Sequence, residues 1–385
     1  MTNGDGASQL HYLPPQRCSG DALIEMSQIV KTFRNAAGEF KALKGVTACF
    51  DSGEFVSVVG KSGSGKSTLV NMITGIDHPT SGTVRVGDVY VHALDESDRS
   101  VWRGANLGIV FQFFQLLPTL TLLENVMLPM FLKGHFSPAQ RELRSLELLK
   151  TVGLEGLEYK LPAAVSGGQQ QSAAIARALA NDPPILIADE PTGNLDERTA
   201  DEVFDLFSTL IDQGKTILMV THDISLAQRT TRTLLLSDGE LIHPWIASAF
   251  SNLSYSEMLW LTHHLRPVNF EGGQVLDRAQ YKPEWVLLVD QGRLEVFDAA
   301  ANPDGTALDV LDSGGFLSSF DLDDHGSPQL SIRASQSGPV ELLVLEGLEF
   351  QDWLRQTPAC ETLLREAAGQ RSWLAQLAAD GRSRQ

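Results

Sequence analysis

The sequence contains Gly60-Lys61-Ser62-Gly63-Ser64-Gly65-Lys66-Ser67-Thr68, a loop rich in glycine and serine that ends in Lys-Ser-Thr. It follows the pattern G-x-x-x-x-G-K-[ST], in which glycines let backbone N–H groups approach a triphosphate that a Cβ would keep away. Lys66 is expected to place a charge at the β- and γ-phosphates, and Ser67 a hydroxyl on Mg²⁺. An apolar strand pattern at 55–59 precedes the loop and a helix pattern at 68–73 follows it. A mere surface loop would leave this context unexplained.

The net charge of −18 over 385 residues argues against nucleic acid as the main partner, because a phosphate backbone requires a basic surface. The length indicates two or three domains of ~100–200 residues. Residues 1–245 carry 28 acidic and 20 basic side chains, and the shorter stretch 246–385 carries 20 and 10. The second stretch is therefore the more acidic per residue.

The three cysteines, Cys18, Cys49 and Cys360, are few and far apart, so we expect no disulfide framework and a reducing compartment. No apolar run approaches the ~20 residues of a membrane span. The N-terminus lacks the layout of a signal peptide, and residues 1–21 are expected to form a flexible tail.

Strand and helix patterns alternate up to residue 245, which favours an α/β domain over residues 22–245. Residues 22–34 and 39–59 are predicted as strands of an antiparallel sheet around a turn at Gly38, and about 113–172 as a helical insert. The other expected elements are a hairpin at 83–91, strands at 107–111, 185–188 and 216–220, helices at 122–132, 138–152, 169–181, 197–213 and 224–230, and a last hairpin of 233–236 with 240–242.

Beyond a boundary at Pro244, short strands are broken by glycines and flanked by helices. This pattern predicts a small β-barrel or jelly roll over residues 246–356, followed by a C-terminal helix and tail over 357–385. The expected elements are a helix at 254–264, strands at 274–276, 285–289, 294–297, 308–311, 330–334 and 340–345, and helices at 349–353 and 358–378.

Two carboxylates, Asp189 and Glu190, end the apolar strand at 185–188. Asp189 is expected to hold Mg²⁺, directly or through water, and Glu190 to polarise a water that attacks the γ-phosphate. Two acids that only cap a helix are the alternative, and the phosphate loop in the same chain weighs against it.

A second anion cradle is predicted at Ser166-Gly167-Gly168-Gln169, where a helix begins. Two cradles for one nucleotide suggest that a second subunit completes each site, although these four residues alone are a common turn. Gln112 and His222 follow two strands, at the sheet edge where α/β proteins place ligands. Taken singly, either residue is more often structural.

In this order the motifs resemble those of an ATP-binding-cassette (ABC) ATPase, over about residues 23–243. The resemblance implies a RecA-like P-loop core with an antiparallel β subdomain and a helical insert. Its motifs fall on the phosphate loop 60–68, the Q-loop residue Gln112, the signature 165–169, the Walker B strand 185–189 with Glu190, the D-loop 193–196 and the switch histidine His222. Phe33 matches the aromatic position that stacks on adenine.

The resemblance also implies a mechanism in which two copies close head-to-tail around two ATP–Mg²⁺. Phosphates are held by Lys66, Ser67 and the loop amides of one copy and by Ser166, Gly168 and Gln169 of the other. The remaining implied roles are Glu190 as base, His222 as the residue that orients the γ-phosphate, Asp196 as a contact to the opposite copy, and Ser67, Gln112 and Asp189 as the metal set.

Residues 111–121 with Glu124-Asn125-Val126 resemble the macrolide-export and lipoprotein-release group, in which the ATPase works with a membrane permease. Two positions depart from the family pattern. Val165 stands where leucine is usual, and Ser172 where arginine is usual. The second departure bears on the rate of hydrolysis, and activity is still expected because the phosphate, metal and base positions are all present.

Residues 254–356 resemble a cyclic-nucleotide-binding-like domain through 265–276, 289–296 and 311–316. Its ligand site does not carry over: Ser318-Ser319 replace the Gly-Glu pair for the ribose, and Pro328 or Gln329 replaces the arginine for the cyclic phosphate. Arg333 is offset by several residues. A regulatory or dimerising domain without a small ligand is the preferred hypothesis, a different ligand the next, and we do not expect a cyclic nucleotide.

Three functions fit the whole chain. The preferred one is the ATP-hydrolysing subunit of a membrane transporter, cytoplasmic and peripheral on the inner face of the membrane through its permease. The alternative is an ATPase switch of the cell-division type, which acts through a permease-like partner without moving a solute. A soluble ABC protein of repair or translation is weaker, because such proteins usually carry two cassettes in one chain.

Overall fold

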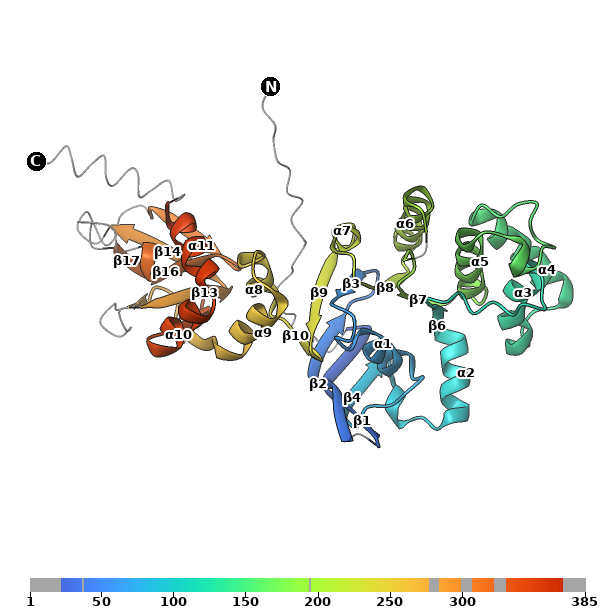
Figure 1. Cartoon of the computed structure of the whole chain (residues 1–385), viewed down its shortest axis with the longest axis horizontal. Coiled ribbons are helices and arrows are strands. Elements are labelled where there is room, and N and C mark those ends of the chain that lie inside the picture. Colours follow the sequence, from blue (N-terminus) through green and yellow to red (C-terminus); the bar gives the residue numbers. More distant parts are fainter. Residues whose placement is uncertain are drawn as a thin grey trace, which may run out of the picture. The chain divides into compact units, whose positions relative to one another are not determined.

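The computed structural model describes residues 22–36, 38–193, 195–276, 284–298, 307–321 and 330–369. They divide into two compact units, one up to Leu241 and one from Ile242 (Figure 1). Within the described residues, no helix is long and apolar enough to cross a bilayer.

A six-stranded sheet forms the centre of the first unit, in the order β10-β9-β3-β8-β7-β6. All its neighbouring pairs are parallel except β9 with β10. Its strands are β3 (Phe55–Val59), β6 (Leu107–Val110), β7 (Ile185–Asp189), β8 (Thr216–Thr221), β9 (Arg232–Ser237) and β10 (Glu240–Leu241). β3 and β8 are buried along their whole length, because both faces of the sheet are covered.

A second, antiparallel sheet has the order β2-β1-β4-β5, with β1 (Ile24–Asn35), β2 (Gly38–Phe50), β4 (Ser81–Val86) and β5 (Val89–Tyr90). The prediction of one strand over 39–59 is wrong. A turn at 51–54 separates β2 from β3, and β3 belongs to the parallel sheet. Gly53 has a positive φ of 76°, which reverses the chain there.

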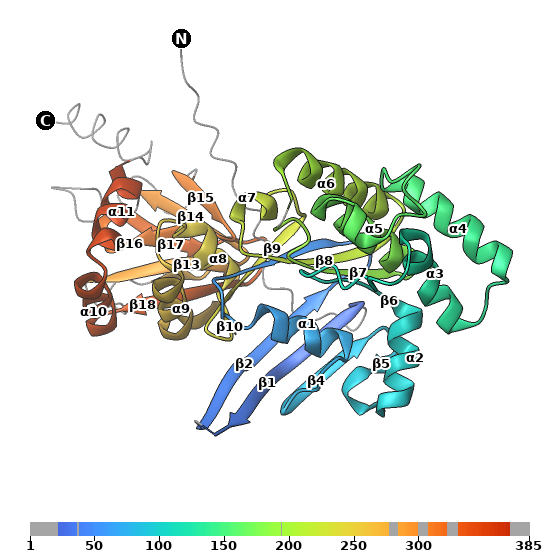
Figure 2. The ribbon, with the colours of Figure 1, turned by 45° about the vertical axis from the view of Figure 1, so that its right-hand side comes forward.

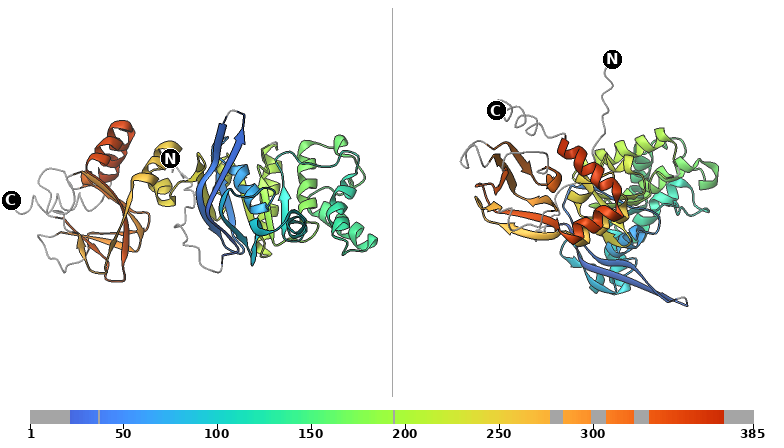
Figure 3. Two further views of the ribbon diagram at one scale, coloured as in Figure 1. Left: turned by 90° about the horizontal axis from the view of Figure 1, so that it is seen from below. Right: turned by 60° about the vertical axis from the view of Figure 1, so that its left-hand side comes forward.

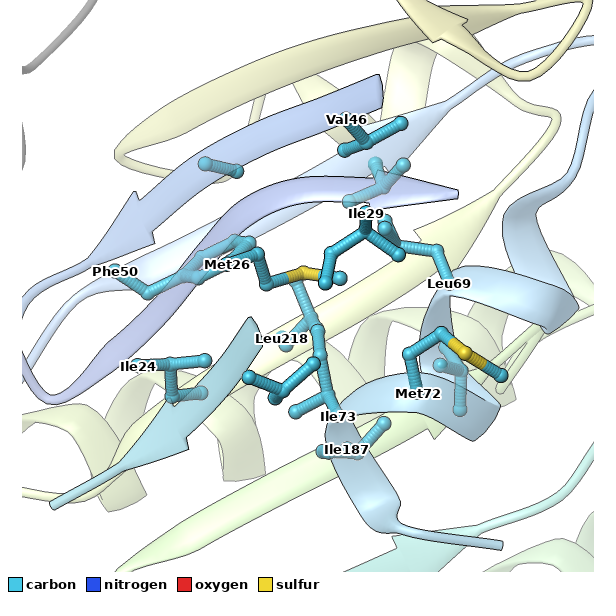
Figure 4. Close-up of a cluster of buried hydrophobic side chains, with 14 of the residues drawn as sticks. Ile24, Met26, Ile29, Val46, Phe50, Leu69, Met72, Ile73, Ile187 and Leu218 are labelled. Atoms are coloured by element: carbon cyan, nitrogen blue, oxygen red, sulfur yellow. The ribbon is translucent and has the colours of Figure 1, made fainter. Parts of the chain in front are cut away.

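Helix α1 (Lys66–Thr74) packs between the two sheets (Figure 2). Its apolar face, with Leu69 and Ile73, meets Met26 and Ile29 from one sheet and Leu218 from the other in a single buried cluster (Figure 4). The phosphate loop that precedes α1 is thereby anchored to both sheets.

The remaining helices of this unit are α2 (Glu96–Asn106), α3 (Leu122–Lys133), α4 (Pro138–Thr151), α5 (Gly167–Leu179), α6 (Glu197–Asp212) and α7 (Ile224–Ala227). α3, α4 and α5 pack on one another around a core of their own. They correspond to the helical insert that the sequence predicts. α5 contributes to this core through Ala173 and Ala176 and to the core under the parallel sheet through Ile175 and Leu179. It therefore joins the insert to the sheet.

In the second unit, two helices, α8 (Pro244–Ala249) and α9 (Tyr255–His264), precede two antiparallel sheets. One has the order β11-β18-β13-β16 and the other β12-β17-β14-β15. The strands are β11 (Arg266–Phe270), β12 (Val275–Leu276), β13 (Trp285–Gln291), β14 (Arg293–Asp298), β15 (Asp309–Asp312), β16 (Phe316–Ser318), β17 (Leu330–Ala334) and β18 (Val340–Glu346).

The two sheets share one apolar core, which includes Leu287 and Leu342 from the first and Leu294 and Ile332 from the second. Among the described residues they are not closed into the predicted barrel, since β11, β16, β12 and β15 each lack a second neighbour. The chain continues into α10 (Leu348–Gln356) and α11 (Pro358–Gly369). Figure 3 shows the strands of this unit in orange and these helices in red.

The sequence led us to expect no disulfide framework. Cys49 is nevertheless disulfide-bonded, whereas Cys360 is free and buried. Burial raises the pKa of the Cys360 thiol to about 12, so it remains protonated at neutral pH. Cys18 and the 1–21 tail lie outside the described residues.

Candidate active site

The phosphate loop at 60–68 is held in its shape by close backbone packing. A Cβ on Gly60 would lie 2.2 Å from the carbonyl oxygen of Leu236, and one on Gly65 would lie 2.6 Å from that of Ala42. Gly65 also has a φ of 107°, which L side chains rarely adopt. Of the other loop residues, Lys61, Ser62, Gly63 and Ser67 are exposed, Ser64 is buried and Thr68 is half-buried in α1.

Lys66 is the first residue of α1 and its ammonium group folds back over the loop. Its Nζ donates to the carbonyl oxygens of Gly60 at 2.8 Å and Lys61 at 3.1 Å. Burial lowers the pKa of Lys66, while the charges of Glu190 and Asp189 act in the opposite direction. The lysine thus lies within the electrostatic reach of both predicted carboxylates.

The strand order explains why these groups meet. β3, β8 and β7 are neighbouring parallel strands, so their carboxyl ends lie at one edge of the sheet. The phosphate loop follows β3, Asp189 ends β7, and Thr221 ends β8 with His222 next. Parallel pairing therefore brings the loop together with residues that are about 120 to 160 positions further along the chain.

Asp189 forms a hydrogen bond with the side chain of Ser67. Burial raises the pKa of the Asp189 carboxyl, the hydrogen bond from Ser67 and the charge of Lys66 lower it, and the neighbouring charge of Glu190 raises it again. The net shift is upward. Two carboxylates beside one lysine leave negative charge that a divalent cation would compensate.

These residues fit Mg²⁺, which prefers hard oxygen ligands and keeps several waters or phosphate oxygens. Ser67 and Asp189 supply a hydroxyl and a carboxylate at the same place. No group of three or more His, Cys, Asp or Glu side chains that could enclose a metal occurs in the described part of the chain. Ser67 and Asp189 would supply two of its ligands, and waters or phosphate oxygens would fill the remaining positions.

Glu190 is held between β7 and β8 with its side chain only 10% exposed. Its N–H donates to the carbonyl oxygen of Val220 at 2.8 Å, and its φ of 49° turns the side chain out of the strand direction. His222, which is 66% exposed, places Nδ1 2.9 Å from both carboxylate oxygens. The Thr221 hydroxyl donates to the same carboxylate at 3.4 Å.

Thr221 is a residue of this site that the sequence reasoning missed. Its hydroxyl also accepts from the Asp223 N–H at 3.1 Å, so it fixes the backbone beside His222. A hydroxyl residue at the end of a fully buried strand was the available signal.

Gln112 is exposed and follows β6 at the junction with the helical insert. The segment after it is fixed by Arg177 of α5, a second residue that the sequence reasoning missed. Arg177 donates to the carbonyl oxygens of Phe114 at 2.8 Å and Gln115 at 2.6 Å. Gln115 has a positive φ of 49°. The arginine therefore connects the 112–115 segment to the helix that begins at the signature turn.

The signature turn, Ser166 to Gln169, caps α5 with a reciprocal pair of hydrogen bonds. The Ser166 hydroxyl accepts from the Gln169 N–H at 3.2 Å, and the Gln169 side chain accepts from the Ser166 N–H at 2.9 Å. Ser166 and Gly167 are exposed. α5 lies apart from α1 (Figures 1 and 2). Within the described residues, no hydrogen bond or ion pair joins this turn to the phosphate loop.

Asp196 caps α6, where it accepts from the Thr199 N–H at 3.0 Å and from the Thr199 hydroxyl at 2.9 Å. These hydrogen bonds lower the pKa of the Asp196 carboxyl. Gly168 lies close by, because a Cβ on it would be 3.1 Å from the Thr199 methyl group. The signature turn and the D-loop are thus neighbours, and Asn194 lies outside the described residues.

Phe33 lies near the end of β1 and its ring is 42% exposed. The Lys31 ammonium lies 5.0 Å from the ring centroid and is paired with Asp77 at 2.6 Å. The cation therefore occupies the space on one side of an otherwise exposed aromatic ring.

Comparison with known proteins gives the family. The family model described as "ABC transporter" matches residues 43–193. An ABC transporter ATP-binding protein of Mycobacterium tuberculosis is 44% identical over 221 residues, which cover 57% of this chain and 89% of the relative. The lipoprotein-releasing system ATP-binding protein LolD of Legionella pneumophila is 41% identical over 222 residues, 57% of this chain and 97% of the relative.

A solved structure of a Methanocaldococcus jannaschii ATP-binding cassette, dimeric and bound to ADP and Pi after hydrolysis, aligns with a TM-score of 0.55 at 43% identity. The alignment covers 57% of this chain and 96% of that one. The α/β fold of the first unit is thus that of an ABC ATPase. The chain belongs to the ABC transporter ATP-binding protein family and is an ATPase.

Proposed function

We propose that this protein is the ATP-hydrolysing subunit of an ABC membrane transporter and that it works as an ATP-sandwich dimer on a separate permease. The observation that carries the proposal is the separation of two anion cradles. The loop at Lys66 meets Asp189 and Glu190, whereas the turn at Ser166 lies exposed on the helical insert. A second copy is the simplest source of the missing half of each site.

In the dimer, Lys66, Ser67 and the loop amides of one copy hold the phosphates, and the Ser166–Gln169 turn of the other holds the γ-phosphate. A cap at a helix N-terminus suits this task, because its N–H groups and the helix dipole favour an anion. Mg²⁺ on Ser67 and Asp189, with Gln112 beside it, would neutralise charge on the phosphates. Asp196 would contact the opposite copy.

Glu190 is the proposed general base. Its carboxylate accepts from His222 and Thr221, which fix its direction, and its main-chain bond to Val220 fixes its position. In this arrangement the carboxylate takes the proton of the attacking water. The exposed side chain of His222, which contacts Glu190, is the proposed group that orients the γ-phosphate.

The proposed permease contact lies on the helical insert, beside Gln112. Phe113, Leu117 and Tyr159 are exposed apolar or aromatic side chains there, at 74%, 44% and 70%. The loop that carries Leu117 is shaped by Asn125, which is fully buried. Its side chain accepts from the Leu117 N–H and donates to the carbonyl oxygens at 117, 120 and 121. An apolar surface on a rigid loop suits a protein partner.

Replacing Leu117 with aspartate is expected to remove the protein from membranes and leave its ATPase activity in solution unchanged. A charge at this surface opposes apolar docking, while the side chain lies outside the nucleotide pocket. The measurement is co-purification with the membrane fraction of the source cell, with Tyr90→Asp, an exposed aromatic on β5, as the matched control. Equal membrane association of wild type and Leu117→Asp would contradict the proposed contact.

The proposal also includes an alternative function and a location in the cell. The alternative function is a switch of the cell-division type, which uses the same chemistry without a transported solute. Localisation on the cytoplasmic face of the membrane follows from the permease contact.

For the second unit we propose a cyclic-nucleotide-binding-like β domain that regulates or dimerises without a cyclic nucleotide. Side chains at its candidate ligand positions already form hydrogen bonds or ion pairs with other residues of the chain. Ser318 is buried, with its N–H and hydroxyl donating to Asp321, and Arg333 pairs with Glu295 at 3.0 Å. Pro328 and Gln329 lie outside the described residues. Calorimetric titration with cyclic AMP and cyclic GMP should give no binding heat, and micromolar binding would overturn the proposal.

A further inference from the structure

A second exposed aromatic side chain stands beside Phe33. In the antiparallel pairing of β1 with β2, Phe40 lies directly opposite Phe33, so both side chains project from the same face of the sheet. Phe40 is 58% exposed and Phe33 42%. Among the ring contacts of the described residues, none joins these two rings.

The hairpin that carries this pair passes the phosphate loop. A Cβ on Gly65 would lie 3.1 Å from the side chain of Leu43, which belongs to β2. Phe40 is three residues from Leu43 along the same strand, about 10 Å at the usual rise. Phe33 and Phe40 therefore lie on the hairpin that packs against the phosphate loop, toward its turn.

Two ion pairs flank the aromatic pair. Lys31 pairs with Asp77 at 2.6 Å and lies over the Phe33 ring. Arg34 pairs with its cross-strand neighbour Glu39 at 2.7 Å, one position beyond the aromatic pair. The lysine occupies one side of the Phe33 ring, so a base has to use the remaining exposed aromatic surface. Phe40 extends that surface across the strand pair.

We propose that Phe40 is a second base-contacting residue, and that the purine of a nucleoside triphosphate lies against both Phe33 and Phe40. This inference rests on the proposed nucleotide site and on the proposed stacking role of Phe33. Stacking on an aromatic ring tolerates different bases, so the pair selects for the presence of a base rather than for one base edge.

The test compares a ligand that has a base with one that lacks it. Dissociation constants of Mg²⁺–ATP and of Mg²⁺–tripolyphosphate are measured by calorimetry on the full chain. Phe40→Ala is expected to weaken ATP binding about fivefold and to leave tripolyphosphate binding unchanged. Phe40→Tyr keeps an aromatic face and should bind ATP like the wild type. Tyr90→Ala, at an exposed aromatic of the same sheet, is the matched control and should bind both ligands normally.

The results distinguish a wrong role for Phe40 from a wrong location of the base site. If Phe33→Ala weakens ATP binding and Phe40→Ala does not, the role of Phe40 is wrong and the site stands. If neither variant affects ATP binding while Lys66→Ala abolishes it, the assignment of the base site is wrong. Equal weakening of ATP and tripolyphosphate by Phe40→Ala would show damage to the hairpin and would also overturn the inference.

Discussion

Glu190→Gln should lower ATP hydrolysis by about 100- to 10 000-fold while ATP binding remains, because the amide cannot accept the proton of the attacking water. The substitution is close to isosteric, and the contacts of the side chain with His222 and Thr221 can persist. Without hydrolysis, the ATP-bound dimer should accumulate. Light scattering after size-exclusion chromatography with ATP and Mg²⁺ should then give about twice the monomer mass of 42.0 kDa.

Glu142→Gln is the matched control, because Glu142 is an exposed carboxylate on α4, away from the sheet edge. It should hydrolyse ATP like the wild type and should not accumulate as a dimer. Wild-type turnover by Glu190→Gln would refute the assignment of the base. Loss of ATP binding by this variant would instead indicate that Glu190 is needed for the shape of the pocket.

Ser166→Asp should lower hydrolysis by at least about 100-fold, the scale of losing one oxyanion donor, with ATP binding to the single chain unchanged. Aspartate is as good an N-cap as serine, so α5 keeps its capped end. Its negative charge, however, would face the γ-phosphate of the other copy. The effect should therefore fall on closure of the dimer and on turnover, and not on the fold.

Ser166→Asn is the matched control for this prediction. Asparagine caps a helix as well as aspartate does but carries no charge, so most of the hydrolysis should remain. Steady-state ATPase rates and binding of a fluorescent ATP analogue separate the two effects. If aspartate and asparagine behave alike, the signature turn does not face a phosphate.

The sequence predicted the structure best where the chemistry of a motif requires particular elements on either side of it. The loop at 60–68 predicts a strand before it and a helix after it, and β3 and α1 are there. The edge shared by Asp189 and His222 could be expected from parallel pairing alone. The contact of His222 with Glu190 could not, because it depends on the left-handed φ of Glu190, which nothing in the sequence signals.

The features that were not predicted from the sequence also have physical explanations. α2 has no fully buried residue and few apolar side chains, and it was not predicted. The turn at 51–54 joins two strands directly, and only tertiary pairing assigns β2 and β3 to different sheets. β11 and β16 of the second unit were missed because one is largely exposed and the other is short. The lack of barrel closure depends on strand pairing, which a pattern of short strands does not specify.

Each hydrolytic site is proposed to take its phosphate loop and base from one copy and its signature turn from another. A mixture of the two variants above tests this sharing between copies. Glu190→Gln has an intact turn and Ser166→Asp an intact base, so a mixed dimer contains one complete site. Each variant alone should show only its low residual rate, and the mixture, combined before ATP is added, should hydrolyse ATP well above both. A mixture no more active than its components, although mixed dimers form, would contradict this sharing.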